Sequence, residues 1–143
     1  MSKLDQARET IVSEIKNRVA ASAFASIPIA YPNHAFSQPP NAPWVRVSLI
    51  GGDSNQASLG LSPTDRHVGI LQFDVVVPED SGIKTGNEIG EFLGSIFDKK
   101  QFLATPGNSL NFKVPSYIWM GTTQGGGVRL MVRIPYRRDV KDS

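Results

Sequence analysis

Three stretches of alternating apolar residues constrain the fold of this chain more than any other feature. The stretches 44–50, 71–77 and 128–136 carry an apolar side chain at every second position. The apolar sets are Val45, Val47 and Leu49; Leu71, Phe73, Val75 and Val77; and Val128, Leu130, Val132, Ile134 and Tyr136. Because successive side chains of a strand point to opposite faces, this period predicts three strands that share one continuous apolar face. An apolar sheet face must be covered, and two amphipathic segments are available to cover it.

The first of these segments, 3–24, predicts a helix at the N-terminus. Its apolar residues recur at three- and four-residue spacing: Leu4, Ala7, Ile11, Val12, Ile15 and Val19. Ser2 and Asp5 have the spacing of a capping box, and Pro28 prevents any extension beyond Ile27.

The second segment predicts a helix from about Thr85 to Lys99. Its apolar face is formed by Ile89, Phe92, Leu93, Ile96 and Phe97. Thr85 and Glu88 have capping-box spacing, and Lys99 and Lys100 follow at the end that the helix dipole favours for cations. Gly86, Gly90 and Gly94 lie four apart along the edge of the apolar face. Each costs about 1 kcal/mol relative to alanine, so we expect another backbone to approach closely there, from the sheet of the same subunit rather than from a neighbouring subunit.

An extended arm precedes the first strand. Residues 28–50 hold half of the ten prolines of the chain: Pro28, Pro32, Pro39, Pro40 and Pro43. Proline fixes φ and removes a hydrogen-bond donor, so the arm cannot be helical. The arm contains three aromatic residues at intervals, Tyr31, Phe36 and Trp44, whereas a solvated linker would be depleted in aromatic residues. We therefore expect the arm to be docked, within the subunit, across a subunit boundary, or both.

The remaining segments predict short strands and turns. The Gly/Ser/Asn-rich segment 51–65 is either a long hairpin with a ragged tip or a mobile loop. Alternation over 110–114, an aromatic strand at 117–120 and a glycine-rich turn at 122–127 complete the pattern. Strands with interspersed helices, and without regular βαβ alternation, predict an α+β fold. We expect one domain over 1–143, with a single mixed, mainly antiparallel sheet, two helices packed on one face, and long loops.

Composition narrows the classes of function. The chain has 143 residues, a formal net charge of +2 and no cysteine, which excludes a disulfide scaffold and cysteine-ligated metal sites. A charge this small does not by itself argue for nucleic-acid binding. No signal peptide and no run of about 20 apolar residues is present, so we expect synthesis in the cytoplasm and no membrane span.

The search for catalytic chemistry finds no credible active site. His34 and His67 are the only histidines, and neither has a metal-ligand spacing. No nucleophile elbow occurs, and the triple glycine 125–127 lacks the lysine and helix of a phosphate loop. The pair Glu79 and Asp80 belongs to a turn signal. We predict neither an enzyme nor a cofactor or metal.

Arginines form a pattern on the last strand. Arg129 and Arg133 lie on the face opposite its apolar residues, and Arg137 continues that face beyond Pro135. This is either the solvated face of a terminal strand or an electrostatic interface to an acidic protein surface or to phosphates. Aromatic residues do not interleave with these arginines, which disfavours nucleic-acid readout.

The order of these features resembles the tail terminator-like proteins of long-tailed bacteriophages. The motifs that carry the resemblance are PIAYPN (28–33) with Phe36, PWVRV (43–47), Leu59 and Gly60, RHVGILQFDVVVP (66–78), Gly82, the helix ending near Phe97, and VRIPY (132–136). They extend over almost the whole chain. In 51–65 and 101–127, however, the sequence does not match the family pattern residue by residue.

The resemblance implies a non-enzymatic subunit of a hexameric ring at the head-proximal end of the virion tail, assembled in the bacterial cytoplasm. Such a ring caps the tail tube, ends its polymerisation and offers a docking surface to the head-side connector. Its implied partners are further copies of itself, the tail tube protein and the connector or stopper, while DNA passes through the lumen without specific binding. Ring closure needs a heterologous interface. Our candidate interface residues are Tyr31, Phe36, Trp44, Arg46, Arg129, Arg133 and Arg137.

Three other functions remain open at this point. The chain is alternatively a head–tail connector or adaptor, which shares most of these features. A nucleic-acid-binding module would use the arginine strand and would lose affinity steeply with salt. A small enzyme or ligand-binding domain would require a deep pocket with convergent polar groups.

Overall fold

The computed structural model describes residues 2–32, 36–37, 39, 42–56, 64–78, 83–122 and 127–141. Several predicted features lie outside these residues: His34, the pair Glu79 and Asp80, the tip of segment 51–65, and most of the turn at 122–127.

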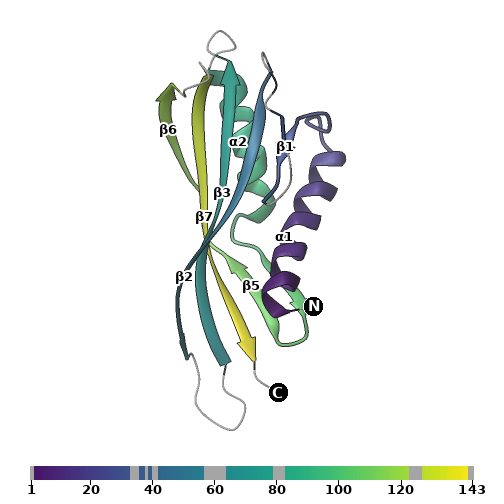
Figure 1. Cartoon of the computed structure of the whole chain (residues 1–143), viewed down its shortest axis with the longest axis vertical. Coiled ribbons are helices and arrows are strands. Elements are labelled where there is room, and N and C mark those ends of the chain that lie inside the picture. Colours follow the sequence, from purple (N-terminus) through teal and green to yellow (C-terminus); the bar gives the residue numbers. More distant parts are fainter. Residues whose placement is uncertain are drawn as a thin grey trace.

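Within the described residues, two helices and seven strands follow one another (Figure 1). In order they are α1 (Lys3–Ala20), β1 (Ile29–Ala30), β2 (Trp44–Gln56), β3 (Thr64–Pro78), α2 (Ile83–Phe97), β4 (Gln101–Thr105), β5 (Asn108–Phe112), β6 (Ser116–Thr122) and β7 (Gly127–Lys141). No helix in the described residues is long and apolar enough to span a membrane.

One mixed sheet contains all of the strands, in the order β1-β2-β3-β7-β5-β4. β7 pairs with β3 along its whole length, and its other edge is divided between β6 and β5. β6 pairs with the first half of β7 and β5 with the second half. Among the described strand pairs, only the short pair of β1 and β2 is parallel. The predicted α+β class, with a mainly antiparallel mixed sheet, is therefore confirmed.

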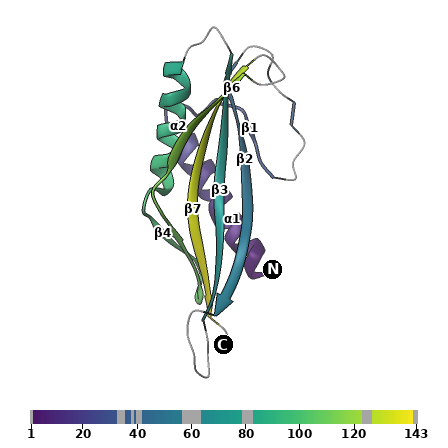
Figure 2. The same cartoon turned by 90° about the vertical axis from the view of Figure 1, so that its left-hand side faces the viewer.

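Both helices cover the same face of the sheet, as predicted (Figure 2, where α1 passes behind β3 and β2 and α2 stands at the left, beside β6 and β7). The three alternating sets pack there against the apolar stripes of α1 and α2. Phe97 of α2 lies at the centre of an aromatic cluster, with ring centroids of Phe112, Phe102 and Phe73 at 4.8, 5.6 and 6.4 Å. We call the face of the sheet that the two helices cover the covered face, and the opposite face the open face.

The predicted first helix is too long by four residues. α1 begins at Lys3, with the Ser2 hydroxyl accepting a hydrogen bond from the Asp5 amide, but it ends at Ala20 rather than at residue 24. The hydroxyl of Ser22 donates to the Val19 carbonyl at 2.8 Å and accepts from the Phe24 amide, which replaces the next helical turn. The apolar stripe is also narrower than predicted, because Leu4 is 67% exposed.

The predicted cap of the second helix is wrong. α2 begins at Ile83, so Thr85 lies inside the first turn rather than at the N-cap. The helix ends at Phe97, and Lys99 follows it with a φ of 55°, beyond the last turn. The left-handed conformation of Lys99 turns the chain back toward β4. Two strands, β1 and β4, were not predicted, because neither alternates over more than a few residues.

The glycines of α2 are contact points for side chains of the sheet. A Cβ atom at Gly90 would lie 2.5 Å from Cδ2 of Leu130, and one at Gly86 would lie 2.7 Å from Cη2 of Trp119. A Cβ atom at Gly94 would overlap the hydroxyl of Tyr117. Side chains of β6 and β7 thus fill the space that the glycines leave. The packing is within the subunit, as expected, but side chains rather than another backbone make the close approach.

Segment 51–65 contributes to a long hairpin. β2 continues to Gln56 and β3 starts at Thr64, with an irregularity in their register between Gly51 and Ser54.

Candidate assembly surface

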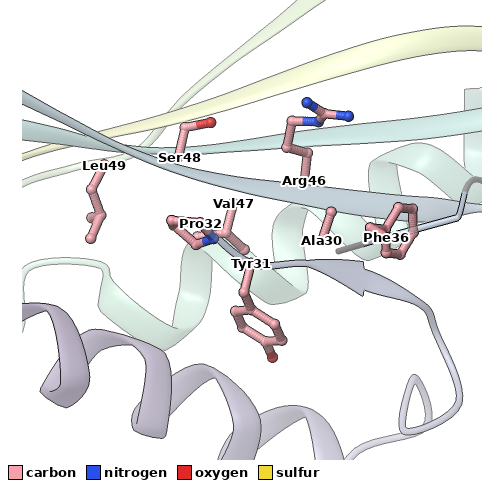
Figure 3. Close-up of a pocket in the computed structure, with 8 residues that line it drawn as sticks. All are labelled: Ala30, Tyr31, Pro32, Phe36, Arg46, Val47, Ser48 and Leu49. Carbon is pink, nitrogen blue, oxygen red and sulfur yellow. The ribbon is translucent and has the colours of Figure 1, made fainter. Parts of the chain in front are cut away.

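The seven residues predicted for an interface fall on two sides of the sheet. Tyr31 lies on the covered side, where its ring points toward α1 (Figure 3). The ammonium group of Lys16 lies 5.1 Å from the centre of that ring, and burial raises the pKa of the Tyr31 hydroxyl. Tyr31 therefore anchors the arm within the subunit.

Phe36, Trp44 and Arg46 lie together on the open face. The rings of Phe36 and Trp44 are 5.2 Å apart, and both belong to a small cluster with Ala30 and Val76. The guanidinium group of Arg46 lies 5.5 Å from the centre of the Trp44 ring. Trp44 is buried, whereas Arg46 is exposed above it. The described residues of the arm thus pack on both faces of the sheet.

An open hollow of about 440 Å³ lies beside this edge, where β1 ends (Figure 3). β1 pairs only with Val45 and Arg46, and no other described strand pairs with β2 on that side. Tyr31 and Pro32 of the arm line the hollow together with Ser48 and Leu49. This leaves the backbone of a long strand at the rim of the hollow, a feature that attracts further strands unless it is covered.

The arginines of β7 share the open face with Arg46. Nε of Arg133 donates to Oε1 of Gln72 at 3.2 Å, and Nε2 of Gln72 donates to both carboxylate oxygens of Asp74 at 3.1 and 3.3 Å. Arg129 lies beside Val76 in the register of β3 and β7. The predicted placement of Arg129 and Arg133 opposite the apolar face of β7 agrees with this register.

Arg137 lies farther along the same face and shares a carboxylate with Arg66. Nε of Arg66 is 2.9 Å from one oxygen of Asp139, and Nε of Arg137 is 3.4 Å from the other. Two arginines thus face one aspartate. Together with Arg46, Arg129 and Arg133, they give the open face an excess of positive charge that suits an acidic protein surface.

The sequence prediction missed a second group of residues on the open face. Ile50, Val68, Ile70 and Pro135 line a hollow of about 370 Å³ whose rim carries Arg66, Lys113 and Arg137. Ile50 and Val68 are each 43% exposed. A signal was available, because these apolar residues are out of phase with the apolar sets of their own strands.

The titratable groups of the described residues form no metal-binding cluster. Within the described ranges, no group of three or more His, Asp or Glu side chains is placed to hold a metal ion. The shifted tyrosines have pKa values raised mainly by burial: Tyr31, Tyr117 and Tyr136. Burial also lowers the pKa of Arg138. The surface therefore offers shape, apolar area and positive charge, which are means of association.

Comparisons with known proteins give a family and a shared fold. The sequence model of a family described as "Phage tail terminator protein" matches residues 10–136. A solved structure has the same fold, with a TM-score of 0.73 at 18% sequence identity, and the match covers 96% of each chain. No curated protein matches the chain.

Proposed function

The chain belongs to the phage tail terminator family, whose members are structural proteins of the virion tail, and we propose that it closes into a ring that caps the tail tube. We propose a ring of six copies that ends tube polymerisation and then offers a docking surface to the head-side connector. DNA passes through the lumen of this ring without sequence-specific binding.

The match of the family over residues 10–136 carries this proposal. The two unlike faces of the sheet support it. A closed ring needs a heterologous interface, in which one patch of each copy contacts a different patch of the next. An open face with excess positive charge, opposite a face covered by helices, provides unlike surfaces on one chain.

Oligomeric state and tube capping test the proposal together. The purified protein is examined by native mass spectrometry and electron microscopy, alone and with tail tube subunits of the same phage. We expect a six-copy ring, and tubes that stop growing once it is added. A protein that is monomeric at high micromolar concentration and leaves tube growth unchanged contradicts the proposal. Binding to the connector without binding to tube ends would identify a head–tail adaptor instead.

A further inference from the structure

The edge of β2 beyond β1 carries unpaired backbone groups. The amide of Val45 donates to the carbonyl of Pro28 at 3.0 Å, so the backbone groups of Val45 point to this edge. Because successive residues of a strand direct these groups to alternate edges, those of Leu49 and Gly51 point the same way. β1 pairs only as far as Arg46, and no other described strand pairs with β2 on that side. Such an edge is a template for a further strand.

β4 forms the opposite edge of the sheet (Figure 2) and pairs only with β5 among the described strands. The amide of Phe112 donates to the carbonyl of Lys100 at 2.8 Å, which directs Lys100 and, two residues on, Phe102 toward β5. The backbone groups of Gln101 and Leu103 therefore point away from β5. Leu103 is also 66% exposed, although its neighbour Phe102 packs against the core. β4 thus offers a second unpaired edge.

The two edges match in direction and in face. The strand pairs that lead from β2 through β3, β7 and β5 to β4 are all antiparallel, so β4 runs in the same direction as β2. A second copy, rotated about an axis along the strands, presents its β4 parallel to β2, as β1 is.

Parallel pairing also keeps the faces continuous. In a parallel pair, a residue whose backbone groups point to the partner strand lies beside one whose groups point away from it. Leu103 aligns with Ser109 and Asp139, which places it on the open face. Ile50 lies on the open face too and is 43% exposed. A β4 strand that starts just below β1 therefore brings these two exposed apolar residues together.

On the covered side, the surroundings of the two edges have opposite charge. A groove of about 400 Å³ runs along α1 beside β4, and its charged lining residues are Glu9 and Glu14. Glu9 forms no ion pair within the described residues, and Glu14 makes one contact, of 3.8 Å, with Arg18. Beside β2, Lys16 of α1 lies over the ring of Tyr31, which lines the hollow there. Lys16 also forms no ion pair within the described part of the chain.

We propose that β4 of one copy adds in parallel to the open edge of β2 of the next copy, with Leu103 beside Ile50. Glu9 and Glu14 then face Lys16 across the joint. The occupant is a second copy because one chain carries both edges, in the same direction, with opposite charges beside them. The edges are different patches, so the contact is heterologous and repeats from copy to copy. This inference rests on the proposed ring and specifies how its subunits join.

Cysteine cross-linking tests the pairing directly, because the chain has no native cysteine. The double variant Ile50→Cys with Leu103→Cys is treated with a mild oxidant at assembling concentration and separated on a denaturing gel. Paired strands lie about 4.8 Å apart, which a disulfide can span. We expect a ladder of covalent oligomers that ends at the ring. A mixture of the two single variants is expected to give dimers only, and either single variant alone to give none.

A matched pair, Val68→Cys with Leu103→Cys, controls for random collision. Val68 is as exposed as Ile50, at 43%, but it lies on β3, one strand farther from the joint and out of the reach of a disulfide. A ladder no stronger than this control, in a protein that forms rings, overturns the interface and leaves the ring proposal intact. Wild-type protein that forms no oligomer, alone or on tail tubes, overturns both.

A proline substitution tests whether backbone hydrogen bonds make the joint. Leu103→Pro removes an amide that points away from β5, so β4 keeps its own pairing. We expect self-association, measured by sedimentation, to weaken at least about tenfold, with little change in the unfolding of the monomer. Leu103→Ala keeps the amide and is expected to lose about threefold. Equal association of the two variants would overturn strand addition.

A charge exchange tests the electrostatic part. Glu9→Lys and Lys16→Glu are each expected to weaken self-association about fivefold, because each places like charges together across the joint. The double variant is expected to recover to within about twofold of the wild type. Lys84→Glu, at an exposed position of α2, is the control and is expected to change nothing. Equal losses in the double and single variants would overturn the proposed charge pairing.

Discussion

The covered and open faces of the same sheet differ in what they stabilise. On the covered face, apolar side chains at every second position of three strands are sealed by α1 and α2. On the open face, arginines, a Gln72–Asp74 pair and the exposed Ile50 and Val68 alternate with them. Because antiparallel sheets tolerate solvent on one side, most of the core can lie on the covered face, and only the small cluster at Trp44 is buried on the open face. The rest of the open face is exposed enough to carry the groups that the proposed assembly would use.

The largest effect is expected at the centre of the covered face. Phe97→Ala should lower the free energy of unfolding by about 3–5 kcal/mol, because the side chain is fully buried among aromatic rings. Denaturant unfolding at a concentration too low for association measures this. A loss below about 1 kcal/mol would mean that the cluster around Phe97 is not the core of the fold.

Trp44→Ala tests the part of the open face that is buried beneath the arm. We expect a loss of about 3 kcal/mol, because Trp44 packs against Phe36 and Val76 and holds the arm to the sheet. Tyr31→Ala, which removes the anchor on the other side, is the matched comparison. If Trp44→Ala leaves unfolding unchanged but weakens association, Trp44 contacts a partner rather than its own arm.

These two anchors show why the site was only partly predictable. Aromatic residues in a proline-rich arm indicate docking, but sequence does not tell on which face each side chain lands. Tyr31 and Phe36 are five positions apart and lie on opposite sides of the sheet. The pairing of β1 with β2 decides on which face Tyr31 lies, and a two-residue parallel strand leaves no periodic signal in the sequence.

The covered face was predictable for the opposite reason. The strands show it by a period of two over 71–77 and 128–136, and α1 and α2 show it by helical periods. Each pattern predicts an apolar face, and these faces pack together. The ends of the helices were less predictable. The Ser22 hydroxyl, which donates to the Val19 carbonyl, and the left-handed backbone of Lys99 stop the two helices where the helical periodicity alone would continue them. The hollow at Ile50 and Val68 was missed because its residues come from three strands whose register only the fold sets.

A smaller effect on the covered face is expected for Gly90→Ala. Alanine is the better helix former, yet its Cβ atom would lie 2.5 Å from Cδ2 of Leu130. Overpacking of this kind costs about 1–3 kcal/mol, so we expect net destabilisation in thermal unfolding. Ser95→Ala, on the exposed side of the same helix, is the control. A stabilised Gly90→Ala variant would show that Leu130 moves aside at little cost.

The smallest effect on folding is expected on the open face. Arg133→Ala removes an exposed guanidinium group that donates one hydrogen bond to Gln72, so the free energy of unfolding should change by less than about 0.5 kcal/mol. Denaturant unfolding of the unassociated protein measures this, and Phe97→Ala provides the contrast. A loss above about 1 kcal/mol would mean that Arg133, through Gln72, helps to hold the buried carboxylate of Asp74. The open face would then contribute to folding, and its arginines would not be free to serve assembly alone.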